Sequence, residues 1–321
     1  MTTVSVIVPT LRREASLRRC LRALAAQERP PDEVIVVSRA DDIASRAAAR
    51  AVALPASTRL LLPEVAESGV IVAMQRGLET ATGELIALTD DDAEPTSEWL
   101  ARVVAHFAAD ARIGGVGGLD RQPREQGSER VVGRVQWFGR VIGRHHLGAG
   151  APTQVDLLKG ANCAFRAPLL RALGFDARLR GSGAQQHWEL GVCLPLRRAG
   201  WQLVYDPAVE VVHHVEPRDG ADQFHRGQFD EASLEDAVHN ETLLVLEHLG
   251  LPGRLAHRLW SFGAGTVDAP GLLNAMRLRA QGHRWAWAAR RATQRGRALA
   301  RATLGARSMR PRAMPAPRAT A

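Results

Sequence analysis

The fold class of this 321-residue chain is decided by residues 84–95, Glu-Leu-Ile-Ala-Leu-Thr-Asp-Asp-Asp-Ala-Glu-Pro. An apolar run ends there at three adjacent carboxylates, Asp90, Asp91 and Asp92, and a helical pattern over 97–107 follows. In an α/β sheet, ligands bind at the carboxyl ends of the strands. Hard cations such as Mg²⁺ take oxygen ligands, typically one or two carboxylates plus substrate phosphates. The stretch therefore fits a metal–diphosphate site, and it fits equally an acidic loop that caps the next helix.

Strand and helix patterns alternate along the first third of the chain. Continuous apolar runs predict strands over 4–8, 34–37, 59–62 and 85–88, and apolar positions at helical spacing predict helices over 14–26, 44–51 and 70–80. The strands are apolar throughout, which is typical of a parallel sheet covered by helices on both faces. This pattern predicts an α/β fold with a Rossmann-like, doubly wound and mostly parallel sheet.

The rest of the chain is less regular. Residues 114–160 are rich in Gly and Arg, and we expect loops and short strands there. Further helices are predicted over 168–173, 188–199 and 233–249, and further strands over 203–205 and 209–212. Past residue 250, Leu255, Leu259 and Phe262 share one helical face, and the final dozen residues are predicted to be disordered. We therefore expect one domain over 1–250, with halves at 1–113 and 114–250, followed by an Arg-rich, partly disordered helical tail over 251–321.

Positive charge is concentrated in this tail. The chain carries 42 Lys and Arg against 34 Asp and Glu, a net charge of +8. Residues 271–321 hold twelve Arg and no acidic residue, so the remainder has 30 basic against 34 acidic side chains. Clustered Arg with interleaved Leu and Trp suits an interfacial helix on anionic lipid headgroups, which we expect through residues 254–312. RNA binding and a solvated, disordered tail are the alternatives; nucleic acid is disfavoured as a partner.

The cysteines and the N-terminal residues indicate the cellular compartment in which the protein is expected. Cys20, Cys163 and Cys193 lie far apart, which argues against a disulfide framework or a zinc site. The first residues lack the basic segment of a signal peptide, and no run of about 18 apolar residues occurs. We therefore expect a cytoplasmic protein that lies on the inner face of the plasma membrane if its tail binds lipid.

Four segments of the chain follow the order of one known family. They are Val4-Ser-Val-Ile-Val-Pro-Thr10, the Asp-x-Asp strand Thr82–Pro95, Lys159-Gly-Ala-Asn-Cys-Ala-Phe-Arg166, and Trp188–Trp201 with its continuation through Tyr205-Asp-Pro207 to Val212-His213. With these segments, residues 3–250 resemble the family 2 inverting glycosyltransferases of GT-A fold. The resemblance implies an enzyme that uses Mn²⁺ or Mg²⁺ to move a sugar from a nucleotide-diphospho-sugar to a saccharide or lipid-linked acceptor. Such reactions build polysaccharides and glycoconjugates.

The resemblance also implies roles for single residues. Glu189 takes the place of the general base that removes the acceptor's proton. Metal ligands are expected at Asp92 and His213, and acceptor contacts at Lys159, Asn162 and Trp188. Nucleotide-sugar contacts are expected at Pro9, Thr10, Asp42, Asp90 and Asp91. Within this group we expect Asp90 to lie near the ribose or the metal. Neighbouring side chains at a strand end alternate in direction, so we expect Asp91 to point away from that site.

The chain departs from the family pattern twice. The second strand ends in Ser38-Arg39-Ala40-Asp41-Asp42, so the acidic pair that contacts the nucleobase in the family is displaced. Trp188 replaces the first of two acids in the base motif. These departures leave open a non-catalytic relative that binds nucleotide sugar or scaffolds a complex.

Most of the implied site residues also have an ordinary structural interpretation. Glu189 could be a solvated residue in the first turn of a helix, and Asp42 could be a helix N-cap. Thr10 could simply follow a turn, Lys159 could be a surface charge, and His213 could be structural.

Overall fold

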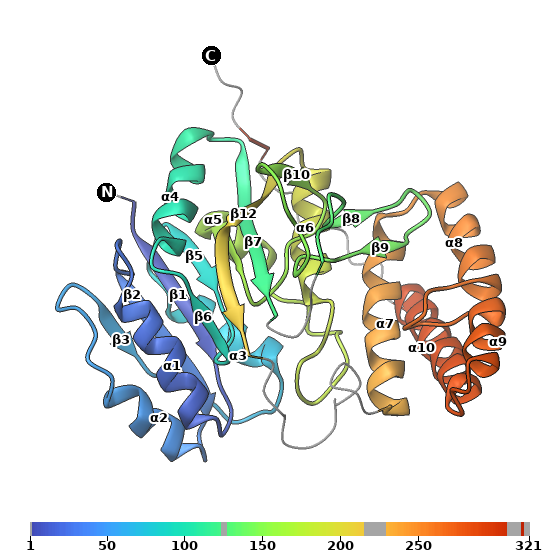
Figure 1. The fold of residues 1–321 in the computed structure, drawn as a ribbon, viewed down its shortest axis with the longest axis horizontal. Helices are drawn as coiled ribbons and strands as arrows, with labels where there is room; N and C mark the ends of the chain where they lie inside the picture. Colours follow the sequence, from blue (N-terminus) through green and yellow to red (C-terminus); the bar gives the residue numbers. More distant parts are fainter. Residues whose placement is uncertain (1, 123–126, 215–228, 307–315, 318–321) are drawn as a thin grey trace.

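The computed structural model describes residues 2–122, 127–214, 229–306 and 316–317. One sheet dominates it. Its strands are β1 (Val4–Pro9), β2 (Glu33–Arg39), β3 (Arg59–Leu61), β4 (Glu64–Val65), β5 (Leu85–Leu88), β6 (Ala93–Pro95), β7 (Ile113–Arg121), β10 (Thr153–Val155), β11 (Cys163–Arg166) and β12 (Gln202–His213). The order is β10-β12-β7-β11-β5-β1-β2-β3, with β4 on β2 and β6 on β12 (Figure 1). A separate small ribbon joins β8 (Arg134–Val135) to β9 (Val141–Ile142).

The first half of the sheet is parallel. β3, β2, β1 and β5 are parallel neighbours, and β12 is parallel to β7. Between these two groups, β11 runs antiparallel to both β5 and β7. The predicted α/β fold with a mostly parallel, doubly wound sheet is confirmed.

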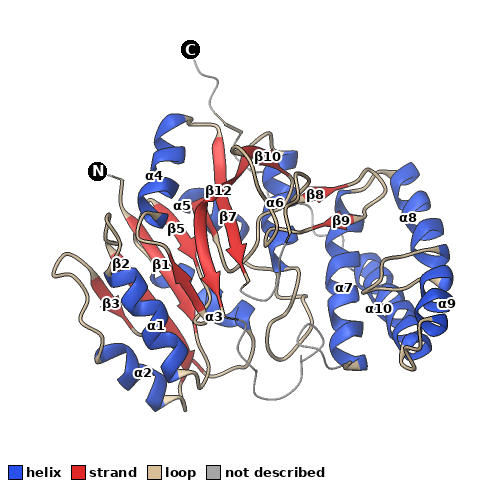
Figure 2. Cartoon of the chain, viewed as in Figure 1, coloured by secondary structure: helices blue, strands red, loops and turns tan. Residues whose placement is uncertain are grey.

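Helices cover both faces of the sheet (Figure 2). They are α1 (Glu14–Ala25), α2 (Ile43–Arg50), α3 (Val70–Thr80), α4 (Trp99–Ala109), α5 (Ala167–Leu173) and α6 (Trp188–Arg198). Strand alternation divides the apolar core in two, since Leu85 packs with α1 and α4 whereas Ile86 packs with α3, α5 and α6. Burial on both faces explains why these strands read as continuous apolar runs.

We expected loops and short strands over residues 114–160, but residues 113–121 form one nine-residue strand. This segment is β7, a strand in the middle of the sheet between β12 and β11. Its glycines are required by close packing, because a Cβ at Gly118 would lie 1.8 Å from the Val209 carbonyl oxygen. A Cβ at Gly115 would lie 2.9 Å from Phe165. Glycine contributes no side chain to an apolar pattern, so the strand left no periodic signal.

The two strands predicted after residue 202 are also one strand. β12 runs unbroken from Gln202 to His213, and its register against β7 shifts between Asp206 and Glu210. An irregularity of this kind bends a strand and redirects the side chains beyond it.

Four helices lie beyond the sheet: α7 (Glu231–His248), α8 (Leu251–Gly263), α9 (Leu272–Ala280) and α10 (Ala286–Ala306) (Figure 1). α10 lies against α7, where a Cβ at Gly296 would meet the Glu235 carbonyl oxygen at 2.4 Å. Most of the stretch predicted to be disordered lies outside the described residues. Among the described residues, no helix is long and apolar enough to cross a membrane. The domain boundaries at 113 and 250 stay predictions; the sheet itself continues across residue 113.

Candidate active site

A cleft of about 690 Å³ opens at the carboxyl ends of β1, β2 and β5. One end is lined by Pro9, Thr10 and residues 37–39. The middle is lined by Asp90–Asp92 and His213, and the far end by residues 186–190, part of α7 and residues 266–269. The cleft therefore runs from the N-terminal strands to the C-terminal helices.

Asp90, Asp92 and His213 meet in the middle of this cleft. One ligand atom from each side chain lies within 4.8 Å of the other two. The acidic residues form the turn between β5 and β6, and His213 is the last residue of β12. β12 pairs with β6 so that His213 is opposite Ala93, and His214 N donates to Asp92 O at 2.9 Å. This pairing brings a histidine from the second half of the chain to the acidic turn.

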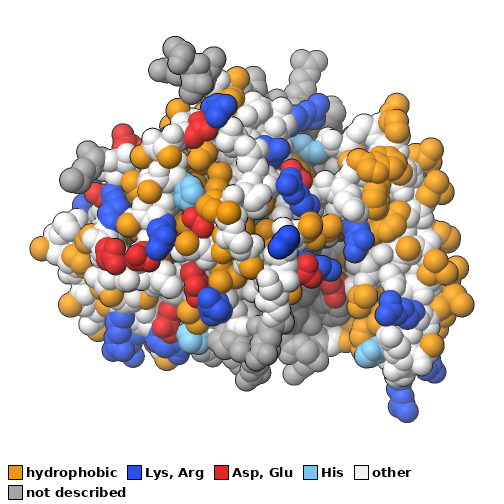
Figure 3. Space-filling view, turned by 45° about the horizontal axis from the view of Figure 1, so that its top comes forward, with side chains coloured by type: hydrophobic (Ala, Val, Ile, Leu, Met, Phe, Trp, Pro, Cys, Tyr) orange, Lys and Arg blue, Asp and Glu red, His pale blue; other side chains and the backbone are white. Residues whose placement is uncertain are grey.

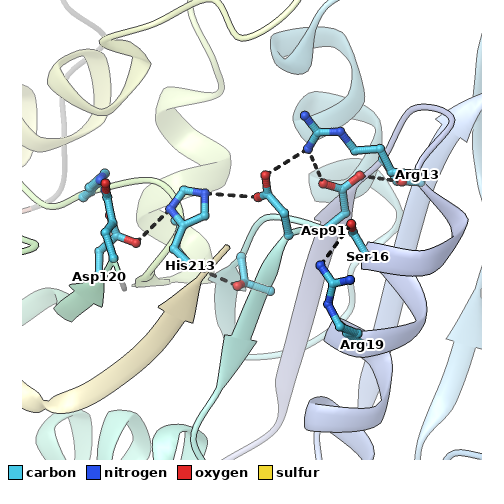
Figure 4. A network of polar contacts seen from close by, with 12 residues as sticks. Arg13, Ser16, Arg19, Asp91, Asp120 and His213 are labelled. Atoms are coloured by element: carbon cyan, nitrogen blue, oxygen red, sulfur yellow. Dashed lines mark hydrogen bonds and ion pairs between the residues drawn. The ribbon is translucent and has the colours of Figure 1, made fainter. Parts of the chain in front are cut away.

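His213 bridges two carboxylates (Figure 4). Its Nδ1 lies 2.9 Å from Asp120 Oδ1, and its Nε2 lies 3.1 Å from Asp92 Oδ1. Burial alone would lower the pKa of His213, but the neighbouring Asp120 and Asp92 carboxylates raise it to about 10. Sequence reasoning missed Asp120, since it ends the glycine-rich segment that we expected to be a loop.

Asp91 turns the other way, towards the start of α1. Its Oδ2 accepts a hydrogen bond from Thr10 Oγ1 at 2.7 Å, and its Oδ1 accepts one from Arg13 Nη1 at 2.9 Å. The same Arg13 nitrogen lies 3.1 Å from Asp92 Oδ2. Burial raises the pKa of Asp91 to about 6, although Arg13 opposes the shift. Arg13 was also missed, because nothing in the local pattern marks one arginine of the loop as special.

Glu189 lies in the first turn of α6 and lines the cleft. Its Oε1 accepts a hydrogen bond from Gly160 N at 2.9 Å, and burial raises its pKa. Trp188 is buried beside it with its ring edge against Phe175, the centroids 5.4 Å apart. A Cβ at Gly160 would lie 2.7 Å from the Trp188 ring, so glycine lets this backbone reach the carboxylate. The carboxylate of Glu189 is thereby fixed in direction, and the residue is half-buried.

Two of the expected site residues do not line the cleft. Asp42 caps α2, accepting from Ser45 N at 3.1 Å, and it also accepts from Arg12 N at 2.6 Å. Asn162 is fully buried: Trp99 Nε1 donates to its Oδ1 at 2.8 Å, and its Nδ2 donates to the Leu119 and Val209 carbonyls. Through these hydrogen bonds, both side chains hold backbone segments of the protein together.

Lys159 does line the cleft, and its ammonium group pairs with Asp120. Pro9, Thr10, Trp188 and Glu189 also line it. With the Asp90–Asp92 turn and His213, the structure thus gathers most of the expected residues at one cavity.

Comparison with known proteins gives one family. The sequence model of the family described as "Glycosyltransferase like family 2" matches residues 2–227. A relative, glycosyltransferase AglE of Haloferax volcanii, is 30% identical over 104 residues, which is 32% of this chain and 34% of that protein. The matched segment thus spans about a third of the curated relative.

Solved structures with a similar fold are also glycosyltransferases. Mannosyltransferase PcManGT of Pyrobaculum calidifontis, in complex with GDP-Man and Mn²⁺, is 23% identical with a TM-score of 0.53 over 96% of this chain and 88% of that one. GalNAc-T7 with UDP, GalNAc and Mn²⁺ is 16% identical, with a TM-score of 0.55 over 77% of this chain and 48% of that one. Residues 1–349 of S. aureus TarS with UDP-GlcNAc give 15% identity and a TM-score of 0.51, covering 96% and 93%.

Proposed function

This chain belongs to the glycosyltransferase-like family 2 and has the GT-A fold, and from that premise we propose that it is a metal-dependent inverting enzyme. The donor is a nucleotide-diphospho-sugar and the acceptor a saccharide or lipid-linked saccharide. One observation carries the proposal: the Asp90–Asp92–His213 group and the half-buried Glu189 line the same cleft. A charge-neutralising site and a general base are the two groups that direct displacement at an anomeric carbon needs.

The side chains in the middle of the cleft fit a divalent cation. Two carboxylates and an imidazole would hold it, and the buried His213 Nε2 makes no well-aligned hydrogen bond among the described residues. Mg²⁺ prefers oxygen ligands alone, whereas an imidazole suits transition metals, so we propose Mn²⁺. Two of the similar structures contain Mn²⁺, which supports this choice. When bound, the ion would neutralise charge on the departing diphosphate.

The nucleotide end of the cleft is the end built on β1 and β2. Pro9 and Thr10 line it, and we propose that both contact the nucleotide sugar. Asp91 would act there indirectly, since its carboxylate accepts hydrogen bonds from the side chains of Thr10 and Arg13. We do not assign a nucleotide contact to Asp42, because both of its carboxylate oxygens accept from backbone amides.

Glu189 is the proposed general base. Its carboxylate takes the proton of the acceptor hydroxyl while that oxygen forms its bond to the anomeric carbon. The bond from this carbon to the diphosphate oxygen breaks, and the electron pair leaves with the nucleoside diphosphate. Burial raises the pKa of Glu189, so the carboxylate is a stronger base than an exposed glutamate. Trp188 and Lys159, which line the cleft beside it, are the proposed acceptor contacts.

The far end of the cleft suggests where the acceptor comes from. Residues 266–269, which connect α8 to α9, form part of its lining. The outer faces of these two helices expose large apolar side chains: Leu251, Leu255, Leu259, Phe262, Leu273 and Met276 (Figure 3). Residues 251–306 also carry ten Arg and a single acid, Asp268. We propose that this face lies on an anionic membrane surface, which would bring a lipid-linked acceptor to the cleft.

Transfer assays test the proposal. Purified protein is incubated with a panel of nucleotide-diphospho-sugars and MnCl₂, and release of nucleoside diphosphate is measured for wild type, Glu189→Gln and Asp92→Asn. We expect Mn²⁺-dependent turnover by the wild type and a loss of about 10²–10⁴-fold in Glu189→Gln. Glu98→Gln, an exposed change on α4 outside the cleft, is the control. Full activity of Glu189→Gln would remove the base assignment, and no turnover with any donor would favour a non-catalytic binding protein.

A further inference from the structure

We infer that Asp120 is a positioning residue that holds the His213 imidazole with Nδ1 protonated and Nε2 directed at the cation. The inference rests on the proposed metal site, and it adds to that site a residue that does not itself contact the ion. It comes from three observations: the contacts of Asp120, the strand register that produces them, and the orientation they impose on His213.

Asp120 has no exposed surface, and both of its oxygens have partners. Oδ1 lies 2.9 Å from His213 Nδ1. Oδ2 contacts the Lys159 ammonium and accepts from Gln122 Nε2 at 3.2 Å. A buried carboxylate is costly unless it is paired and hydrogen-bonded, and here the pairing also fixes the rotation of the carboxylate plane. With the plane fixed in this way, Oδ1 faces His213 Nδ1.

Strand register brings the two residues together. β12 runs parallel to β7 with Val211 opposite Asp120, and His213 follows two residues later on the same face of its strand. On its other side β12 pairs with β6, which places His213 opposite Ala93 and beside the acidic turn. The imidazole therefore lies between Asp120 on β7 and the cleft, with Nδ1 towards Asp120 and Nε2 towards the acidic turn.

A bound cation would displace the proton from Nε2, while Nδ1 would keep the proton that it donates to Asp120, so that the lone pair of the ring is on Nε2. Nε2 is the atom 3.1 Å from Asp92 Oδ1, on the side of the Asp90–Asp92 pair. Histidines that bind metals commonly donate their second nitrogen to a carboxylate, and removal of that partner weakens metal affinity by about 10–100-fold. Asp120 meets this description, and the Lys159 ammonium pairs with its other oxygen, Oδ2.

Mn²⁺ affinity measures this role without any need for donor or acceptor. MnCl₂ is titrated into wild type, Asp120→Asn, His213→Gln and the double variant, and free Mn²⁺ is followed by electron paramagnetic resonance. We expect Asp120→Asn to weaken binding by about 10–100-fold. In the His213→Gln background the same change should weaken binding less than about twofold, because the residue it positions is gone.

The chain offers a matched control. Asp206, on β12, is another buried aspartate that faces a histidine: its Oδ2 lies 2.7 Å from His106 Nε2, outside the cleft. Asp206→Asn should leave Mn²⁺ affinity unchanged. An equal loss on Asp120→Asn in both backgrounds would show a general structural effect and overturn the inference. If the wild type binds Mn²⁺ and Asp120→Asn binds it equally well, the inference about Asp120 is overturned while the proposed metal site stands. If the wild type does not bind Mn²⁺, both the inference and the proposed metal site are overturned.

A second measurement does not need Asp120→Asn, in case that variant does not fold. Nitrogen NMR of the imidazoles, in protein loaded with diamagnetic Cd²⁺, reports which ring nitrogen of His213 carries the proton. The His213→Gln spectrum assigns the resonance. Protonated Nδ1 with cadmium-shifted Nε2 is expected, and the opposite arrangement would overturn the inference.

Discussion

At the scale of single residues, two of the three adjacent carboxylates, Asp91 and Asp92, are held by cationic side chains from distant parts of the chain. Asp92 Oδ1 lies 3.1 Å from His213 Nε2, and Asp92 Oδ2 lies 3.1 Å from Arg13 Nη1. Arg13 also pairs with Asp91 at 2.9 Å. Because all of these groups are largely buried, the mutual repulsion of the carboxylates is offset by protein charges more than by solvent.

Loss of Arg13 should therefore destabilise the protein. Arg13→Gln leaves two buried carboxylates without their shared cation, and breaking a buried pair costs about 3–5 kcal/mol. We expect a lower melting temperature without metal, and a larger rise on adding MnCl₂ than in the wild type, because the ion replaces part of the lost charge. Differential scanning fluorimetry measures both. The neighbouring Arg12→Gln, whose exposed side chain pairs with Asp41 at 3.2 Å, should change little; an equal effect at both positions would contradict the argument.

Glu189 should set the acidic limb of the pH profile. A general base works only when ionised, so activity falls as the pH drops through its pKa. Burial raises that pKa above the ordinary glutamate value of 4.5. Activity should therefore begin to fall at a higher pH than it would if the base were an exposed glutamate. Profiles of kcat/KM between pH 4 and pH 8 measure it for the free enzyme. A limb at or below the ordinary value would contradict the assignment.

At the scale of elements, close backbone contact decides where glycine is needed. On α10, a Cβ at Gly296 would lie 2.4 Å from the Glu235 carbonyl of α7, while a Cβ at Gly305 would meet no atom within 4 Å. The two positions therefore share a helix and differ in their packing. Gly296 allows α10 to approach α7, and Gly305 has no such role.

Alanine should have opposite effects at these two glycines. Gly296→Ala must push α10 away from α7, and overpacking of this kind typically costs about 1–3 kcal/mol. Gly305→Ala should stabilise by up to about 1 kcal/mol, since alanine is the better helix former and has room. Urea unfolding curves give both free energies. Destabilisation of the same size at Gly305 would show that helix contact is not the cause.

The elements also show how far local patterns reach. Every strand and helix of the first 110 residues that was predicted from apolar spacing is present, within one or two residues at most ends. β7 was not predicted as a strand, because four of its nine residues are glycines, which contribute no side chain to an apolar pattern. Asn162 lies in a segment that resembles the family and Asp42 in one that departs from it, yet both side chains bind the protein's own backbone.

At the scale of the whole molecule, α8 and α9 lie on the side away from β1 and β2 (Figure 1), and the segment that connects them lines the far end of the cleft. Leu255 is 62% exposed and Leu259 67%. On α8 the buried side chains His257 and Ser261 face inward, so the outer leucines are left to the surface. A patch of this kind on a protein of this size marks a contact surface.

Vesicle sedimentation tests the membrane proposal. Full-length protein should pellet with vesicles that contain anionic phospholipid and stay in solution with purely zwitterionic vesicles, because the Arg-rich helices add charge attraction to apolar burial. Leu255→Ser with Leu259→Ser should reduce binding at least tenfold. Ile43→Ser, which removes a 69% exposed side chain from α2, is the control. Equal binding by the double variant and the wild type would contradict the proposal.

The sequence by itself determined the parts that are encoded locally: the alternating strands and helices, and the acidic turn that ends β5. These follow from apolar spacing and turn chemistry within about ten neighbouring residues. Only the tertiary structure decided which side chains face that turn. Asp120 and His213 are 93 positions apart, and their contact depends on the register of β12 against both β6 and β7. Register is a relation between strands, and a slip of one residue would turn His213 to the other face of the sheet.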